Sequence, residues 1–171
     1  MIFQEPMTAL NPVLSIGIQM TEALVINGFC NQTEANERAV DMLNRVSITE
    51  PKKRMKQYPH EFSGGMRQRM MIAMVMLIEP SVLIADEPTT ALDVTIQARI
   101  LDLLSSLVSD SNIGLVLITH DMGVVAETSD RVLVMYGGKE VEHANVKQLF
   151  KKPTQPYTKS LLAAVPRLDV K

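Results

Sequence analysis

Two adjacent carboxylates, Asp86 and Glu87, directly follow the apolar run Val82–Ala85. A short apolar run that stops before Pro88 is typical of a buried parallel strand, and ligands bind at the carboxyl ends of such strands in open α/β sheets. One carboxylate can hold Mg²⁺, and the other can orient and deprotonate an attacking water. Because neighbouring side chains of a strand point to opposite faces, we expect different roles for the two. A strand end with two solvated acids would explain the same residues without chemistry.

His120 stands at the end of a second apolar run, Ile113–Ile118. The residues between the two runs have the amphipathic pattern of a helix from Thr95 to Val108. A strand, a helix and a strand in this order predict a parallel, right-handed unit, which places His120 at the same sheet edge as Asp86 and Glu87. An imidazole at that edge can contact a phosphate oxygen or orient a water.

The third candidate is Ser63-Gly64-Gly65, which precedes a strong helical pattern that ends before Pro80. A hydroxyl, bare backbone N–H groups and the positive end of a helix dipole suit an anion such as a phosphate. A serine that caps the helix, followed by two flexible glycines, explains the same three residues structurally.

The elements that must position these residues are predicted from periodicity and from breaking residues. Residues 7–60 read as mostly helical and short of strands, with helices at Ser15–Asn27 and at Thr33–Val46, the second capped by Thr33. Met1–Pro6 reads as the end of a buried strand stopped by Pro6. The elements predicted beyond His120 are a helix at Met122–Thr128, a strand at Arg131–Tyr136, a turn at Gly137-Gly138, an edge strand at Lys139–Glu142, a helix at Asn145–Phe150 and a last helix within Pro153–Pro166.

Composition excludes several classes of protein. The chain has 171 residues, a formal net charge of −2 and a pI near 5.9, which gives no electrostatic case for nucleic acid as the main partner. Cys30 is the single cysteine, so an internal disulfide is excluded and a reducing compartment is expected. Because no apolar run approaches the roughly 20 residues of a membrane span, we expect a soluble, cytoplasmic chain.

Taken together, these segments resemble the motifs of ATP-binding-cassette (ABC) ATPases. Ser63–Arg69 resembles the family signature, and Asp86-Glu87 resembles the second phosphate-site motif with its catalytic glutamate. Thr90–Asp93 is similar to the loop that faces the partner domain, His120 to the switch histidine, and Gln4 to the glutamine that couples the nucleotide site to the membrane subunits. Such single motifs carry a false-positive risk, which their agreement in family order removes.

Finer similarities narrow the branch. The segments 3–12 and 155–166 look like those of peptide importers, a branch that includes dipeptide, oligopeptide, nickel and glutathione uptake systems. The most similar pattern is the first ATPase half of bacterial glutathione importers. The resemblance implies an α/β fold, a partial sheet of the P-loop NTPase type with an inserted α-helical subdomain. The divisions that we expect are a strand end and coupling loop at 1–6, a helical subdomain at 7–79, a catalytic α/β subdomain at 80–144 and a C-terminal helical extension at 145–171.

The resemblance also implies the cofactors and the site. ATP and Mg²⁺ are the expected cofactors, with Asp86 and Gln4 at the metal and Glu87 as the base for water. His120 and Gln4 are expected to arrange the γ-phosphate and the water. A further set of residues is expected to bind the partner's ATP: Ser63, Gly64, Gly65, Gln68 and Asp93. Catalysis of this kind is mostly positioning and charge neutralisation.

One motif of the family is absent. The phosphate-cradling pattern G-x-x-x-x-G-K-[ST] does not occur, and the one Gly-Lys pair, Gly138-Lys139, is followed by Glu140. The chain therefore looks like the C-terminal two-thirds of a nucleotide-binding domain, and we expect it to be inactive alone. A sheet without its first strands would expose an edge and an apolar face, which lowers stability and favours association.

Three readings of function follow. The first is the ATPase subunit of a peptide-type importer, which would pair head to tail with a second ABC domain, meet integral membrane permease subunits at the cytoplasmic face of the plasma membrane, and serve a solute-binding protein indirectly. The second is a catalytically incompetent fragment that acts only in dimerisation or in docking to a permease. The third, a DNA-repair or chromosome-maintenance ATPase, is disfavoured because no sustained heptad pattern is present.

Overall fold

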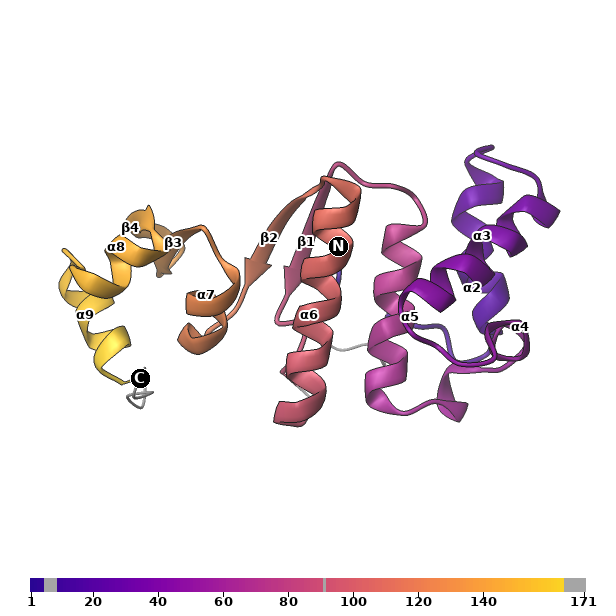
Figure 1. Cartoon of the computed structure of the whole chain (residues 1–171), viewed down its shortest axis with the longest axis horizontal. Helices are drawn as coiled ribbons and strands as arrows, with labels where there is room; N and C mark the ends of the chain where they lie inside the picture. The colour runs from indigo at the N-terminus through magenta and orange to yellow at the C-terminus, as the bar shows by residue number, and fades with distance from the viewer. Residues whose placement is uncertain (5–8, 91, 165–171) are drawn as a thin grey trace. The chain divides into compact units, whose positions relative to one another are not determined.

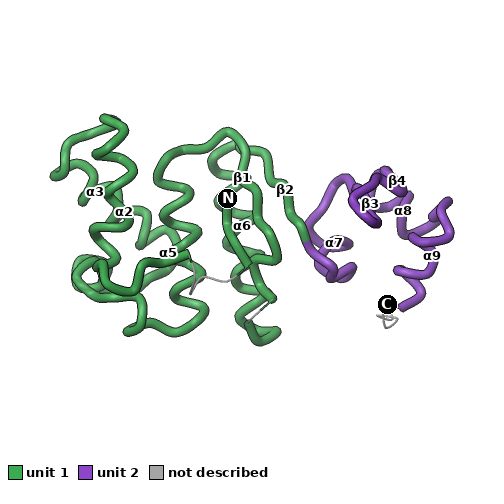
Figure 2. The backbone as a smooth tube through the Cα atoms, turned by 180° about the vertical axis from the view of Figure 1, so that it is seen from behind, with its two compact units in different colours: residues 1–118 green, residues 119–171 purple. Residues whose placement is uncertain are grey.

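The structure is a computed structural model that describes residues 1–4, 9–90 and 92–164 (Figure 1). The chain divides into two compact units, Met1–Ile118 and Thr119–Lys171, which we describe separately (Figure 2). Some sequence predictions fall outside the described residues: the strand stop at Pro6, Ala91 of the partner-facing loop and the last two residues of the segment 155–166.

The first unit contains the predicted parallel strand pair. Strand β1 (Val82–Asp86) pairs with β2 (Gly114–Ile118) in parallel, with Asp86 opposite Ile118. Ile2 forms a parallel bridge to Ala85, and its N–H donates to the Ile84 carbonyl at 2.8 Å. The first residues therefore lie beside β1, as their apolar character predicted.

The two faces of this sheet differ. Leu83 and Ala85 are buried in the core of the first unit. The opposite face carries exposed apolar side chains from both strands, namely Val82, Ile84, Val116 and Ile118. Parallel sheets are usually covered on both faces, so this exposed set, which we call the open sheet face, is unusual. Its exposure agrees with the expectation of an uncovered apolar surface.

Helices form the rest of the first unit. Helix α5 (Gly64–Met76) and helix α6 (Val94–Ser111) lie side by side, and their buried residues belong to one core with those of β1 (Figure 1). The remaining elements of the described residues in this unit are α2 (Ile16–Ile26), α3 (Gln32–Arg45), α4 (Pro51–Arg54) and the short 3₁₀ turn η1 (Pro59–Glu61). Helix α6 continues past the predicted end at Val108 to Ser111, because Asn112 supplies the left-handed conformation (φ 50°) that closes it.

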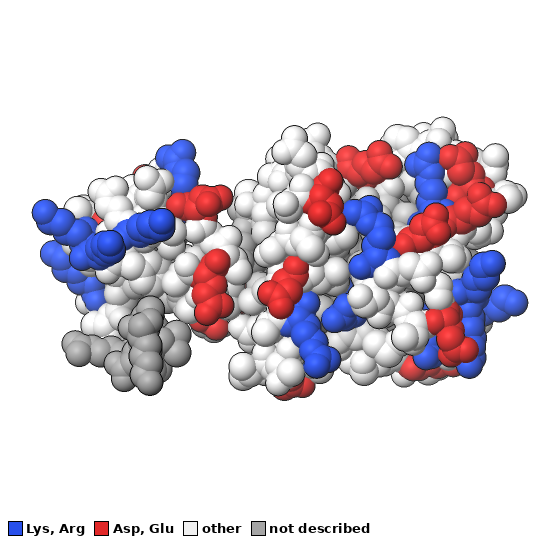
Figure 3. Space-filling view, viewed as in Figure 1, with Lys and Arg blue, Asp and Glu red and all other residues white. Residues whose placement is uncertain are grey.

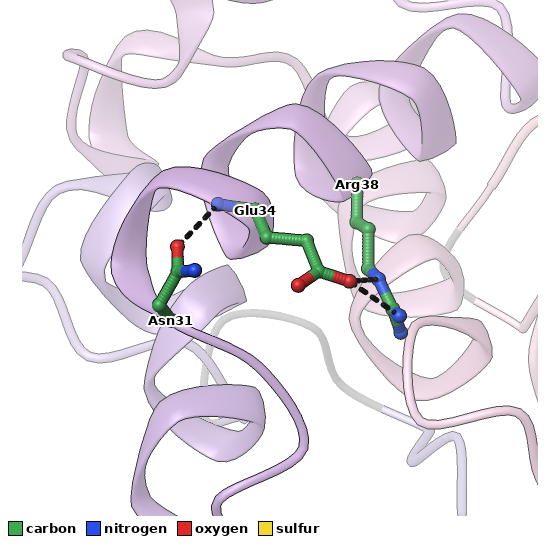
Figure 4. A network of polar contacts seen from close by, with 3 residues as sticks. All are labelled: Asn31, Glu34 and Arg38. Atoms are coloured by element: carbon green, nitrogen blue, oxygen red, sulfur yellow. Dashed lines mark hydrogen bonds and ion pairs between the residues drawn. The ribbon is translucent and has the colours of Figure 1, made fainter.

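The predicted cap of α3 was wrong. Asn31, not Thr33, caps the helix, and its side-chain oxygen accepts from the Glu34 N–H at 3.0 Å (Figure 4). Glu34 in turn pairs with Arg38 at 2.7 Å, one turn further along. The reason is geometric, because the residue three positions before Glu34 is the one whose side chain reaches its N–H, and asparagine is as good a cap as serine.

The second unit is built on an antiparallel hairpin. Strand β3 (Arg131–Tyr136) pairs with β4 (Lys139–Asn145) across Gly137-Gly138, whose φ values of 56° and 74° suit a tight turn. Strand β4 is longer than the predicted Lys139–Glu142 because pairing with β3 extends to Asn145. The helices are α7 (Met122–Thr128), α8 (Val146–Lys151) and α9 (Pro156–Ala163).

A buried carboxylate fastens α9 to this hairpin. Glu142 on β4 accepts from the N–H and hydroxyl of Thr154, each at 2.8 Å, and from the Gln155 N–H at 3.1 Å. Gln155 is the N-cap residue of α9, so the negative charge lies at the positive end of the helix dipole. The Thr158 hydroxyl and these donors of Thr154 and Gln155 lower the pKa of Glu142 to about 2.

Candidate functional site

The two carboxylates leave the sheet in different conformations. Asp86 is the last residue of β1, and its N–H donates to the Ile2 carbonyl at 2.9 Å. Glu87 lies beyond the strand, with φ at 45°, and its N–H donates to the Ile118 carbonyl at 2.9 Å. The expectation that the two alternate along one strand was therefore wrong. Glu87 departs in a left-handed conformation that is strained for a non-glycine residue and that is found most often at functional sites.

Thr90 fixes the Glu87 side chain. The Thr90 hydroxyl donates to Glu87 Oε2 at 2.6 Å, and the Thr90 N–H approaches the Glu87 carbonyl at 3.3 Å. The turn that returns Thr90 to Glu87 contains Pro88 and Thr89, both buried. A carboxylate held in this way keeps its second oxygen in a defined direction, which is what a group that orients a water requires.

The signature serine caps a helix, as the structural reading of Ser63-Gly64-Gly65 proposed. Ser63 Oγ accepts from the Met66 N–H at 3.4 Å, and the Ser63 carbonyl accepts from the Arg67 N–H at 2.9 Å. Ser63 is nevertheless exposed at the start of α5, so its hydroxyl remains open to solvent. Capping and anion binding use the same helix start, and the geometry is compatible with both.

The structure brings the starts of α5 and α6 together. A Cβ built on Gly65 would lie 2.9 Å from Ile96 Cγ2, and a Cβ on Gly64 would lie 3.7 Å from Leu92 Cδ2. Asp93 caps α6, and its Oδ1 accepts from the Ile96 N–H at 3.0 Å. The signature and the segment resembling the partner-facing loop are thus neighbours. The N-termini of α5 and α6, with the positive ends of their helix dipoles, lie close together in the first unit.

Gln68 has a different environment from the other signature residues. It is 1% exposed, among the core residues of α5, and its Nε2 has no hydrogen-bond partner within the described part of the chain. Arg69, on the same helix, donates from Nη1 to the Val46 carbonyl at 2.8 Å, and burial lowers the pKa of its guanidinium. Arg69 therefore ties α5 to the rest of the first unit, and Gln68 is enclosed in its core.

Gln4 and His120 lie next to the strand ends. Gln4 is exposed and follows the bridge at Ile2 by two residues, at the end of β1 that carries Asp86. His120 follows β2 by two residues, and Asp86 pairs with Ile118 at the end of that strand. His120 belongs to the second unit. The parallel order that was predicted for the two strands is confirmed.

The donor set at the end of β1 suits a hard cation. Asp86, Glu87 and Gln4 offer oxygen atoms, which are the ligands that Mg²⁺ prefers, usually together with waters and substrate phosphates. No cluster of three or more His, Cys, Asp or Glu side chains that could hold a metal occurs in residues 1–4, 9–90 and 92–164. This donor set fits a metal site that waters and substrate phosphates complete, which differs from a site made of protein side chains alone.

These features resemble a part of an ABC-type nucleotide-binding domain, and the family comparison agrees. The sequence model described as "ABC transporter" matches residues 1–90, more than half of the chain, so the chain belongs to this family.

Relatives narrow the branch. The chain is 55% identical over 170 residues to "Dipeptide transport ATP-binding protein DppD" of Bacillus subtilis, covering 99% of the chain and 51% of that protein. It is 54% identical over 169 residues to "Oligopeptide transport ATP-binding protein OppD" of Salmonella typhimurium, covering 99% of the chain and 50% of that protein. The chain therefore spans about half the length of the curated relatives that it matches. The finer similarity to glutathione importers stays a prediction.

Solved structures show the same fold. The chain resembles cbiO1 from Clostridium perfringens, described as part of the ABC transporter complex cbiONQ, with 30% identity and a TM-score of 0.76 over 88% of this chain and 58% of that one. It also resembles the ATP-binding cassette MJ0796 in a dimeric post-hydrolysis state bound to ADP and Pi, with 26% identity and a TM-score of 0.71 over 85% of this chain and 61% of that one. The predicted fold class, α/β with a partial sheet, is confirmed.

Sequence reasoning placed Thr90 and Leu92 in the partner-facing loop but missed their contacts, and it missed Ile96. Thr90 holds the Glu87 side chain, and Leu92 and Ile96 lie against the glycines at the start of α5. The three-residue spacing from Glu87 to Thr90 across a proline is a turn signal that would have located the first of these contacts. The packing of Ile96 against Gly65 has no local signal, because the two residues are far apart in the chain.

Helices in the described ranges are all too short or too polar to cross a membrane.

Proposed function

We propose that this chain forms the part of a peptide-importer ATP-binding subunit that supplies the catalytic glutamate, two magnesium ligands and the signature helix. The observation that carries the proposal is the strand end at which Glu87 is fixed by Thr90 at 2.6 Å, within the same unit as the paired starts of α5 and α6. Relatives at 54–55% identity are described as dipeptide and oligopeptide transport ATP-binding proteins, which supports peptides as the solute class.

Each site residue would have one role in this function. Asp86 and Gln4 would hold Mg²⁺, which when bound to phosphates neutralises their charge. Glu87 would accept a proton from the attacking water, with its carboxylate held by the Thr90 hydroxyl. His120 would orient the phosphate and water. Ser63, Gly64 and Gly65 would present a hydroxyl and N–H groups to the ATP of a second ABC domain.

Two further candidate residues would act indirectly. Asp93 would hold the start of α6 as its cap, beside the signature glycines. Gln68, buried in α5, would support the signature helix from within and not touch the nucleotide.

MgATP binding and hydrolysis test this function. We would compare the 171-residue chain with the same chain preceded by the phosphate-cradle segment of a relative, and with Glu87→Gln in that longer form. We expect ATP to bind and turn over only in the longer form, and Glu87→Gln to bind ATP with turnover reduced about 100-fold or more, since a positioned base contributes about 10²–10⁴ in rate.

A matched control separates the base from backbone strain. Glu79 precedes Pro80 as Glu87 precedes Pro88, and both glutamates have positive φ, 49° and 45°. Glu79→Gln should leave turnover unchanged. Full turnover by Glu87→Gln would refute the assignment of the base, and ATP hydrolysis by the chain alone would refute the need for a phosphate cradle.

We also propose that an α-helix of an integral membrane permease subunit docks in a groove between α2, α3 and α4. The groove has a volume of about 950 Å³, and its apolar lining includes Ile18, Val25 and Val40. The charged lining is acidic along α2 and α3 (Glu22, Glu37, Asp41) and basic at Lys52 of α4 and at Lys56, which follows that helix. Both signs of charge gather over this end of the first unit (Figure 3). An apolar floor with charged rims suits an amphipathic helix.

This docking surface, the α2–α4 groove, is tested separately from catalysis. Val25→Asp places a charge on the apolar floor, and Val94→Asp places one on an 83%-exposed site on α6, outside the groove. We expect Val25→Asp to abolish co-purification with the permease pair in membrane vesicles and Val94→Asp to retain it. Equal retention of both would contradict the docking site. The groove is also the feature that favours the second function, an interaction module without catalysis. Docking without ATP hydrolysis in the longer form would select that function.

A further inference from the structure

A short segment, Met55–Phe62, joins the α2–α4 groove to the signature. Met55 and Lys56 line the groove, and Ser63 begins α5 directly after Phe62. Its backbone is tied to the start of α2, because the Gly17 N–H donates to the Met55 carbonyl at 2.8 Å and the Ile16 N–H to the Gln57 carbonyl at 2.9 Å. The wall of the groove and the segment that leads to Ser63 are therefore hydrogen-bonded as one piece.

Gly17 and Met55 are closely packed. A Cβ added to Gly17 would lie 2.8 Å from the Met55 carbonyl oxygen and 3.2 Å from Met55 Cε. Since real Cβ atoms do not approach a backbone oxygen so closely, the substitution Gly17→Ala must displace Met55.

A side-chain network carries the connection onward. Arg54 Nη1 donates to Gln57 Oε1 at 2.9 Å, and Gln57 Nε2 donates to Glu61 Oε1 at 3.0 Å. The other oxygen of Glu61, Oε2, accepts from the Tyr58 N–H at 2.7 Å and closes the turn η1. The Arg54 guanidinium also lies over the Phe62 ring, 5.8 Å from its centre, within cation–π range.

The network ends at the first turn of α5. Phe62 is 4% exposed, so its position is set by the core. Arg67, on α5, donates from Nη1 to the Pro59 carbonyl of the same turn at 3.3 Å. A shift of η1 therefore reaches Ser63 by the chain itself and reaches α5 through Arg67.

We propose that Glu61 is a positioning residue that, through Gln57 and Arg54, couples the wall of the α2–α4 groove to the start of α5, so that a helix docked in the groove changes the position of Ser63. The consequence for transport rests on the proposed function, because that function assigns the groove to a permease helix and Ser63 to the partner's ATP. The coupling itself is a property of the first unit and can be measured without either ligand.

Charge supports the role of Glu61. The Tyr58 N–H and the Gln57 side chain lower the pKa of the Glu61 carboxyl, and His60 and Arg54 add to the effect. His60 stacks on Tyr58 at a ring distance of 5.9 Å, and Arg67 is the charged residue that α5 brings to this turn. Because the folded pKa is lowered, the ionised network is complete above the ordinary range of a glutamate and is lost as the pH falls through the lowered pKa.

The first test uses Gly17→Ala as a wedge. We would record amide NMR spectra of the 171-residue chain and follow Met66 and Arg67, whose N–H groups donate to Ser63. Gly17→Ala should shift both resonances, and the shift should disappear in Glu61→Ala and in Gln57→Ala. The control is Gly114→Ala, whose Cβ meets its nearest neighbour at 3.7 Å, an ordinary contact, and which should leave both resonances in place.

The second test uses pH and a variant that retains a carbonyl acceptor. In the wild-type chain the Met66 resonance should titrate with the Glu61 carboxyl, below the ordinary glutamate pKa of 4.5. Glu61→Gln should abolish this titration, and Glu50→Gln, which removes an exposed carboxylate 3.6 Å from Lys53, should leave it unchanged.

Either of two results overturns the coupling: a Gly17→Ala shift of equal size in the Glu61→Ala background, or a Met66 titration that persists in Glu61→Gln. Neither measurement requires nucleotide or permease. If the NMR tests fail, the ATP and docking assays still test the proposed function. If those assays fail, the NMR tests still measure the coupling as a property of the chain.

Discussion

Gly65→Ala should destabilise the first unit although alanine is the better helix former. The added Cβ would lie 2.9 Å from Ile96 Cγ2, closer than side-chain carbons approach, and 3.7 Å from Ile96 Cδ1. Overpacking of a core contact costs about 1–3 kcal/mol, and the gain from replacing glycine in a helix is about 0.5–1 kcal/mol. Because Ile96 is only half-buried and can shift in part, we expect a net loss of about 1–2 kcal/mol in the free energy of unfolding.

A double-mutant cycle identifies the clashing atom. Ile96→Leu removes Cγ2, and Ile96→Val keeps Cγ2 and removes Cδ1. If the clash is at Cγ2, leucine should recover about 1 kcal/mol or more of the loss and valine almost none. Gly64→Ala is the control, since its Cβ meets Leu92 Cδ2 at an ordinary 3.7 Å and should be neutral or stabilising.

Urea unfolding at two or more protein concentrations provides the measurement. A Gly65→Ala variant as stable as the wild type would refute the close packing of α5 on α6. Equal rescue by Ile96→Val and Ile96→Leu would refute the assignment to Cγ2. The same cycle bears on the site, because this contact sets the spacing between the signature glycines and the Asp93 cap.

Further predictions concern caps and a buried carboxylate. Asn31→Ala should cost about 1 kcal/mol in urea unfolding and Asn31→Asp much less, because only alanine removes the cap of α3; equal losses would contradict the cap. Arg38→Ala should change stability less than Asn31→Ala, since exposed ion pairs contribute little, and a larger loss would count against this. Glu142→Gln should lower the melting temperature at neutral pH. The Glu142 pKa is about 2 when folded against 4.5 for an ordinary glutamate, so its stabilisation is present above about pH 4.5 and is lost as the pH falls toward 2; calorimetry that finds the same pH dependence in Glu142→Gln would refute it.

Local patterns predicted the elements well and the caps less well. The apolar runs Val82–Ala85 and Ile113–Ile118 identified β1 and β2 and their parallel order, because continuous apolar residues and a stop mark such strands. The prediction that both strands are buried was wrong, since one face of the pair is exposed. The cap of α3 was misplaced by two residues. The signal was present, since Asn31 precedes Glu34 by three positions, and a cap–glutamate spacing of three is the usual start of a helix.

Contacts between residues distant in the chain, and the geometry of turns, determine the environments of three glutamates that sequence patterns did not predict. Periodicity treated Glu142 as an ordinary strand residue, yet it is buried because donors from Thr154 and Gln155, twelve and thirteen residues away, satisfy it. Glu61 was likewise unremarked, although its place three residues after Tyr58 is the spacing at which a side chain reaches back to a turn N–H. The strain at Glu87 could not be predicted at all, because φ follows from how the turn through Thr90 is held.

The open sheet face should make the association of this chain depend on its concentration. Val82, Ile84, Val116 and Ile118 lie together on two paired strands at 38–55% exposure. Two copies that meet through these side chains remove apolar area from water, and the probability of meeting rises with the square of concentration. Apparent melting temperature, light scattering and retention on a hydrophobic column should therefore all depend on how concentrated the sample is. Ile84→Lys or Val116→Lys would weaken the dependence of these properties on concentration and leave the buried face, with Leu83 and Ala85, unaltered.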